Sequence, residues 1–180
     1  RAVPAISANL FPLADGGEGT LDAVLYAMRG ARRIRRVAGA AGAPVDAAHG
    51  VIEDAAGTIA VIESAQVVGL AMAGASDVAQ RSTRGLGELV RCCLDQGLRR
   101  FMIGLGGSST SDGGAGVLAA LGVRLLDASG RPVDPTPAGL AALDRADFAD
   151  LDTRIAQCDI TLMTDVDNPL CGPDGATATF

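Results

Sequence analysis

Six glycines, four hydroxyl side chains and one carboxylate lie together between Gly104 and Gly116 of this 180-residue sequence. Glycines let the backbone take positive φ and approach a ligand closely, so successive N–H groups can face one anion at the start of a helix. The carboxylate, Asp112, suits such a site when a divalent cation bridges it to the anion. We therefore predict a phosphate-binding loop with the donors Gly106, Gly107, Ser108, Ser109, Gly113 and Gly114.

Carboxylates follow predicted strands at three places: Asp15 with Glu18, Asp112, and Asp165 with Asp167. Ligands of α/β sheets gather at the carboxyl ends of strands, so these loops can line one crevice. A phosphoryl-transfer enzyme needs magnesium ligands, a group that orients the attacking hydroxyl, and donors for phosphate oxygens in that crevice. The structural alternatives are helix capping at the first two places and an Asx turn at the third.

Composition and charge narrow the class of protein. The net charge of −6 argues against a nucleic-acid partner, which normally requires a basic face. No apolar run reaches the roughly 18 residues that span a bilayer, and no secretory signal is recognisable, so we expect a soluble, cytoplasmic protein without a membrane partner. All fifteen basic residues are arginines, which excludes a Walker-type lysine within these residues. The cluster from Arg32 to Arg36 is interpreted as the exposed face of a strand.

Metal and triad chemistry through cysteine or histidine is not expected. Cys92, Cys93, Cys158 and Cys171 show no ligand spacing, and His49 is the single histidine. We interpret all five as structural and place His49 in a turn before Gly50.

Apolar periodicity predicts helices and strands in alternation, with one antiparallel meander. The expected elements are a strand over 5–14, a helix from 21 to 30, three strands within 31–64, a helix over 83–96, a strand over 101–103, a helix from 113 to 122, and strands over 123–126 and 160–164. The meander between helical units excludes a simple repetition of βαβ.

Three segments resemble the signatures of bacterial glycerate kinases that use ATP. They are Pro12 to Thr20, Gly104 to Gly116 and Asp165 to Gly175, in the order and spacing of that family. Ile62-Glu63-Ser64-Ala65 and Gly85 to Leu89 resemble two further stretches, so the similarity covers essentially the whole chain. It implies a two-lobed α/β fold: a flavodoxin- or Rossmann-like parallel-sheet lobe that includes residues 1–30, and a mixed α/β lobe with the meander in residues 31–180, both incomplete in this chain.

The resemblance also implies a transferase that phosphorylates D-glycerate with ATP and Mg²⁺, at the 2-hydroxyl, as a step of organic acid phosphorylation. A homo-oligomer is a possible assembly. As a working hypothesis we assign catalytic roles to Asp15, Glu18 and Asp165, substrate binding to Gly16, Gly17, Arg84 and Asn168, and magnesium binding to Asp112, Asp165 and Asp167.

Two other functions remain open from the residues. Asp165-Val-Asp167 at a strand end resembles the start of haloacid-dehalogenase-type phosphatases, in which the first aspartate is a covalent nucleophile, although Pro169 stands where that family has threonine or valine. The other alternative is a non-catalytic module for phosphate-ligand binding or oligomerisation.

Overall fold

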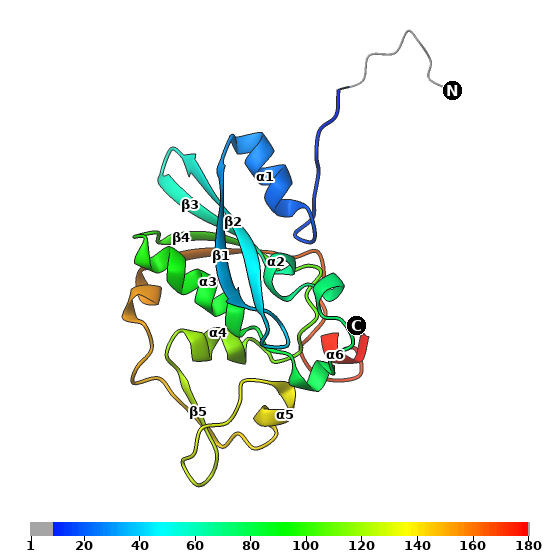
Figure 1. Ribbon diagram of the computed structural model, residues 1–180, viewed down its shortest axis with the longest axis vertical. Coiled ribbons are helices and arrows are strands. Elements are labelled where there is room, and N and C mark those ends of the chain that lie inside the picture. The colour runs from blue at the N-terminus through cyan, green and yellow to red at the C-terminus, as the bar shows by residue number, and fades with distance from the viewer. Residues whose placement is uncertain (1–8, 180) are drawn as a thin grey trace, which may run out of the picture.

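The computed structural model describes residues 9–179, which form a mixed α/β structure built on one large and one small sheet (Figure 1). The strands are β1 (Ala31–Ala38), β2 (Pro44–Asp54), β3 (Gly57–Glu63), β4 (Arg100–Gly104), β5 (Arg124–Leu126), β6 (Arg145–Asp147) and β7 (Asp159–Met163). The α-helices are α1 (Thr20–Met28), α2 (Ala65–Val68), α3 (Arg84–Asp95), α4 (Ala115–Ala120), α5 (Pro137–Leu140) and α6 (Ala176–Thr179). Short 3-10 turns are η1 (Leu70–Met72), η2 (Val78–Gln80) and η3 (Thr153–Gln157).

The large sheet has the order β1-β2-β3-β4-β7 and joins two kinds of pairing. The pairs β1–β2 and β2–β3 are antiparallel, as tight turns between consecutive strands require. The pairs β3–β4 and β4–β7 are parallel. The mixed α/β class and the predicted meander are therefore confirmed. The parallel part brings the carboxyl ends of β3, β4 and β7 to one edge of the sheet.

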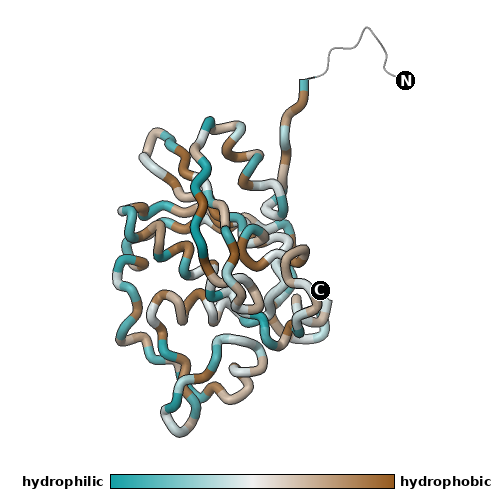
Figure 2. Tube along the Cα trace, viewed as in Figure 1, coloured by the Kyte–Doolittle hydropathy of each residue, from teal (hydrophilic) through white to brown (hydrophobic). Residues whose placement is uncertain are grey.

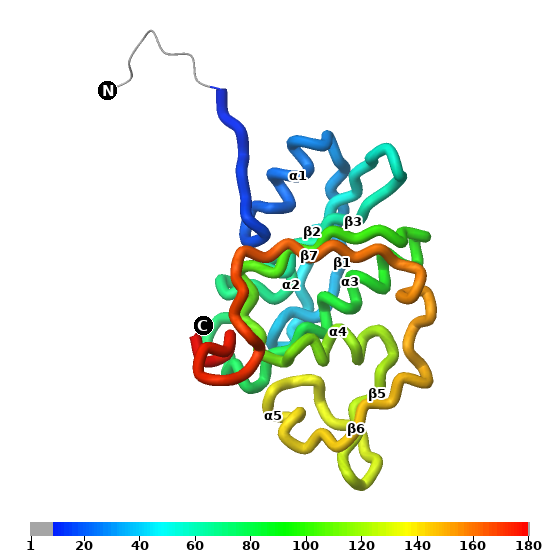
Figure 3. Tube along the Cα trace, turned by 180° about the vertical axis from the view of Figure 1, so that it is seen from behind, coloured from blue at the N-terminus to red at the C-terminus, as the bar shows by residue number. Residues whose placement is uncertain are grey.

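Helices cover both faces of the large sheet. Alternate residues of β3 point to opposite faces, so this strand contributes to the core on each side. Ile59 and Val61 pack with Leu21 of α1, whose side chain is fully buried. Ala60 and Ile62 face the larger core built from α2 and α3. In Figure 3, β4 and β7 run between α1 on one side and α3 on the other. The apolar stripe of α1 thus holds this helix against the sheet. Asp15 and Glu18 directly precede the helix, so its packing also determines where they lie.

Strand β1 is an edge strand and carries the arginine cluster. Its residues from Ala31 to Arg36 are exposed, and the teal trace along β1 in Figure 2 marks their polarity. The interpretation of this cluster as the exposed part of a strand is confirmed. The small sheet pairs β5 with β6 and lies with α5 beyond α4, away from the carboxyl ends of the parallel strands (Figure 1).

Three sequence predictions differ from the structure. Of the predicted strand over 5–14, residues 5–8 lie outside the described part, and residues 9–14 form no strand, because no described strand lies beside them to complete a ladder. His49 lies in the middle of β2 rather than in a turn, and its side chain is completely buried. The third difference is a set of short elements that apolar periodicity does not reveal: α2, α5, α6, β6 and the three 3-10 turns.

The predicted lobe boundary at residue 30 stays a prediction. Helix α1 packs on β2 and β3 of the large sheet, so the residues on both sides of that boundary share one core here. Within residues 9–179, no helix combines the length and the apolar character that a bilayer crossing needs.

Candidate active site

The segment Asp15–Gly19, called the acidic loop below, packs directly on the glycine loop, Gly104–Gly116. The N–H of Gly106 donates to the carbonyl oxygen of Gly16 over 3.0 Å. A Cβ atom at Gly106 would lie 2.6 Å from the Cα of Gly17, a distance that real Cβ atoms do not reach. Glycine is therefore required at position 106 by the approach of a second backbone, not by its own φ.

The carboxylate of Glu18 lies over Gly107. A Cβ atom at Gly107 would stand 2.4 Å from Oε1 of Glu18, and the backbone φ of Gly107 is +69°. The positive φ favours glycine here, and a Cβ atom would push the end of the Glu18 side chain aside. The contact places an exposed carboxylate beside the loop predicted to bind phosphate.

Strand β7 brings the third loop to the same place. The N–H of Leu105 donates to the carbonyl oxygen of Met163 over 3.0 Å, and a Cβ atom at Gly16 would lie 2.7 Å from that same oxygen. Met163 ends β7 two residues before Asp165. In Figure 3, the acidic loop, the start of the glycine loop and the end of β7 meet at one edge of the sheet.

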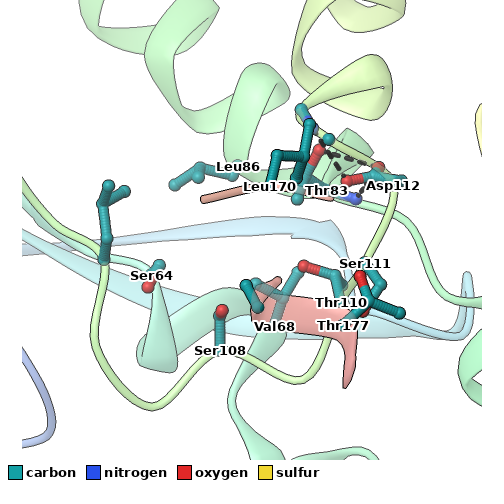
Figure 4. A pocket seen from close by; sticks show the side chains of 14 residues that line it. Ser64, Val68, Thr83, Leu86, Ser108, Thr110, Ser111, Asp112, Leu170 and Thr177 are labelled. Atoms are coloured by element: carbon teal, nitrogen blue, oxygen red, sulfur yellow. Dashed lines mark hydrogen bonds between the residues drawn. The ribbon is translucent and has the colours of Figure 1, made fainter. Parts of the chain in front are cut away.

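A pocket of about 320 Å³ opens along the glycine loop. Hydroxyl groups come from Ser64, Ser108, Thr110 and Ser111, and apolar walls come from Val68, Leu86, Leu105 and Leu170. Figure 4 shows the hydroxyl groups of Ser64 and Ser108 on the same side of this pocket. Backbone and hydroxyl donors beside apolar walls suit a ligand with both a phosphate and an apolar part. The segment from Leu170 to Thr177, with the start of α6, closes one side.

Asp112 lines this pocket, but its carboxylate is occupied by the protein. Oδ2 accepts hydrogen bonds from the N–H and the hydroxyl of Thr83, over 2.7 and 2.9 Å, and from the Ser82 hydroxyl and the Gly116 N–H; Oδ1 accepts one from the Gly114 N–H. Dashed lines in Figure 4 join Thr83 to Asp112. The side chain is 3% exposed and ties the start of α3 to the start of α4. Its contacts are those of a helix cap, the alternative considered from the sequence.

The predicted magnesium ligands do not form a site together. Within residues 9–179, no three acidic, histidine or cysteine side chains are placed to hold one metal ion. Asp112 is 3% exposed and its carboxylate accepts five hydrogen bonds inside the protein, which leaves little of it open to a metal ion. Asp165 and Asp167 are exposed, and no described hydrogen bond or ion pair engages their carboxylates.

The predicted phosphate-binding residues divide into three groups. Ser108, Gly113 and Gly114 line the pocket, whereas Gly106 and Gly107 lie beneath the acidic loop. Ser109 is buried, and its hydroxyl donates to the carbonyl oxygen of Val68 over 2.8 Å, so it serves the fold.

The predicted substrate-binding residues also differ in what they can offer. The N–H groups of Gly16 and Gly17 already donate to Thr20 Oγ1 and Asp15 Oδ1. Asn168 donates from Nδ2 to the carbonyl oxygen of Asp174. Arg84 is the exposed first residue of α3, directly after pocket-lining Thr83, and no described hydrogen bond or ion pair engages its guanidinium.

Sequence reasoning did not assign Ser64, Thr83, Thr110 or Ser111 to a site, although all four line the pocket. Ser64 could have been found, because Glu63-Ser64 follows a predicted strand just as the three acidic loops do. Thr83 could not, since only its bonds to Asp112, 29 residues later, bring it to the pocket.

Comparison with known proteins identifies the family of this chain. A family model described as Glycerate kinase family matches residues 1–180. The chain belongs to the glycerate kinase family. It is 43% identical over 179 residues to a glycerate kinase of Bacillus subtilis, covering 98% of this chain and 46% of the relative. It is 42% identical over 171 residues to a glycerate 2-kinase of Escherichia coli, covering 94% of this chain and 44% of the relative.

A solved structure from Salmonella typhimurium LT2, described as a glycerate kinase 2, superposes with a TM-score of 0.86 at 41% identity. That match covers 94% of this chain and 46% of the solved chain. The chain therefore spans about half the length of the glycerate kinases that it matches. A family match over all 180 residues leaves the resemblance to haloacid-dehalogenase-type phosphatases without support beyond the motif at Asp165.

Proposed function

We propose that the complete protein transfers the γ-phosphoryl group of ATP to the 2-hydroxyl of D-glycerate, giving 2-phosphoglycerate and ADP. The observation that carries the proposal is the contact of the acidic loop with the glycine loop, with Glu18 over Gly107, beside a hydroxyl-lined pocket. This arrangement places exposed carboxylates next to hydrogen-bond donors that suit phosphate, and phosphoryl transfer uses both kinds of group. Membership of the glycerate kinase family supports the choice of acceptor.

In the proposed reaction, the glycerate hydroxyl oxygen forms a bond to the γ-phosphorus. The bond from that phosphorus to the oxygen bridging to the β-phosphate breaks, and ADP leaves. The hydroxyl proton passes to Asp15 or Glu18, whose carboxylates are exposed at the edge of the glycine loop. Little covalent chemistry falls to the protein, so its contribution is position and charge.

The ligand contacts follow from the groups that remain available. The Ser108 hydroxyl and the N–H group of Gly113 would bind phosphate oxygens of ATP, since the N–H of Gly114 already donates to Asp112. Arg84 would bind the glycerate carboxylate, because the N–H groups of Gly16 and Gly17 already have acceptors. ATP is ordinarily used as its magnesium complex, and Asp165 and Asp167 are the predicted ligands left to hold that ion. We further propose a cytoplasmic location, where ATP is available.

The test is an assay of ADP release by the complete protein with D-glycerate, with L-glycerate as the control, followed by ³¹P NMR of the product. We expect release that depends on D-glycerate and a phosphorus signal coupled to the proton on carbon 2. Binding of ATP without release of ADP would instead favour a binding module. Phosphoenzyme trapped at Asp165 would favour the phosphatase.

A further inference from the structure

We propose that Glu63, a buried carboxylate at the end of β3, is a positioning residue that holds the acidic loop in place for catalysis. The inference rests on the proposed function, since it assigns Glu63 a role in that reaction. Glu63 is 1% exposed, so it cannot itself contact a substrate from its present position.

Both carboxylate oxygens of Glu63 are used inside the protein. Oε2 accepts from the N–H of Leu21 over 2.9 Å, and Oε1 accepts from Nε2 of Gln66 over 3.2 Å. Leu21 is the second residue of α1, a helix whose own N-cap, Gly19, supplies no side-chain hydrogen bond. A helix start leaves backbone N–H groups without partners. Glu63 therefore caps α1 from another element, 42 residues away in the chain.

The cap is connected to the acidic loop by a second buried hydrogen bond. The N–H of Gly16 donates to Oγ1 of Thr20, the first residue of α1, over 3.0 Å. The acidic loop is thus closed on the first turn of α1, and Glu63 fixes that turn on the end of β3. Any shift of the turn moves Asp15 and Glu18 relative to Gly107.

The residue after Glu63 holds the other loop. The N–H of Ser64 donates to the carbonyl oxygen of Gly104 over 2.9 Å, and the Ser64 hydroxyl donates to that of Gly106 over 3.3 Å. Two consecutive residues at the end of β3 therefore set the spacing of the acidic loop and the glycine loop. Loss of the Glu63 carboxylate should displace the acidic loop and leave the glycine loop held by Ser64.

The experiment compares Glu63→Leu and Glu63→Gln in the complete protein. Glu63→Leu keeps the approximate volume and removes both acceptors, whereas glutamine keeps an acceptor for the Leu21 N–H once the Gln66 amide turns over. For Glu63→Leu we expect kcat to fall about 10- to 100-fold, the scale of a misplaced catalytic group, and KM for ATP to change little. Glu63→Gln should restore kcat to within a few fold of the wild type. Amide hydrogen exchange over residues 16–22 should speed up in Glu63→Leu only.

A matched control is Glu88→Leu. Glu88 of α3 accepts from the N–H of Ala38 over 2.9 Å, so this variant also removes a carboxylate that ties a helix to a backbone group, but one of β1. We expect lower stability with little change of kcat. Unchanged exchange over residues 16–22 in Glu63→Leu, or kcat within twofold of the wild type, would overturn the inference. If the wild type itself is inactive with D-glycerate, the proposed function fails, and the exchange measurement still decides the positioning.

Discussion

The carboxylate of Glu18 lies over the Cα of Gly107, so close that a Cβ atom there would stand 2.4 Å from Oε1. The two residues come from loops 89 positions apart, one at the start of α1 and one after β4. Their contact brings an exposed carboxylate to the loop that we propose binds phosphate. In the proposed reaction this carboxylate can accept the proton of the attacking hydroxyl, which phosphoryl transfer to a hydroxyl requires.

Gly107→Ala should displace the Glu18 carboxylate and lower kcat of the complete protein by about tenfold or more, as expected for a misplaced catalytic group. The control is Gly97→Ala, since Gly97 also has positive φ, +84°, but no atom of the described residues lies within 4 Å of its Cβ position. Both variants should lose about 1–2 kcal/mol of unfolding free energy through the left-handed backbone. Steady-state kinetics and urea unfolding separate the two effects, and equal kcat values in both variants would argue against a role for the contact.

Asp112→Ala should destabilise the protein by about 3 kcal/mol or more, because buried donors at the starts of α3 and α4 lose a charged acceptor. Asp112→Asn keeps one acceptor oxygen and should lose less. The control is Asp127→Ala, which removes a carboxylate that accepts from backbone N–H groups in an exposed turn. Thermal unfolding measures these losses. If Asp112→Asn kept the stability of the wild type and its activity depended less on Mg²⁺, a magnesium-binding role of Asp112 would be supported.

His49 should make the folded state sensitive to acid. Burial, and then the charges of Arg35 and Arg33, hold the pKa of His49 below its ordinary value of 6.5. Neither ring nitrogen has a hydrogen-bond partner among residues 9–179. The unfolded chain therefore binds a proton that the folded protein resists, and stability falls as pH decreases through 6.5 and towards the lower folded-state pKa.

The measurement is Tm between about pH 7.5 and pH 5.5, a range that spans the ordinary histidine pKa. His49→Leu should flatten the decline and leave stability at neutral pH equal or higher, because the two buried ring nitrogens without partners are then removed. An identical decline in both proteins would show that other groups cause it.

Arg84→Gln should raise KM for D-glycerate by about tenfold or more, because the variant loses the binding free energy of a charge-assisted hydrogen bond to the substrate carboxylate. KM for ATP should stay nearly constant. Arg36→Gln serves as the control because Arg36 is an exposed arginine of β1 that pairs with Asp46. Steady-state kinetics with each substrate varied in turn check this assignment. Equal effects of the two variants would remove Arg84 from the substrate site.

The secondary structure could be predicted where the apolar pattern of a helix or strand lies within one continuous segment. The stripe of Leu21, Val24 and Leu25 predicted α1, and the apolar runs predicted the meander, β4 and β7. His49 was misplaced because Gly50 suggested a turn. In the structure, Gly50 is needed because Leu21 and Leu25 of α1 pack against it: a Cβ atom there would lie 2.9 and 2.8 Å from their methyl groups.

Contacts between residues that are distant in the chain escaped prediction. Helix capping by Asp112 was an alternative from the sequence, but its partner Thr83 was not predicted, and the buried position of Glu63 depends on α1. Helix α2 has only four residues, too few to show a helical period. The loops themselves could be named from the sequence, whereas the contacts between them required the fold.

The most direct test of the site is the kcat of Asp15→Asn/Glu18→Gln in the complete protein with saturating ATP and D-glycerate. The double variant removes both carboxylates of the acidic loop and changes none of the residues that line the pocket. We predict a fall in kcat of about 100-fold or more, the contribution of a positioned general base, with KM for ATP nearly unchanged. A kcat within about tenfold of the wild type, below the range for general base catalysis, would contradict the account.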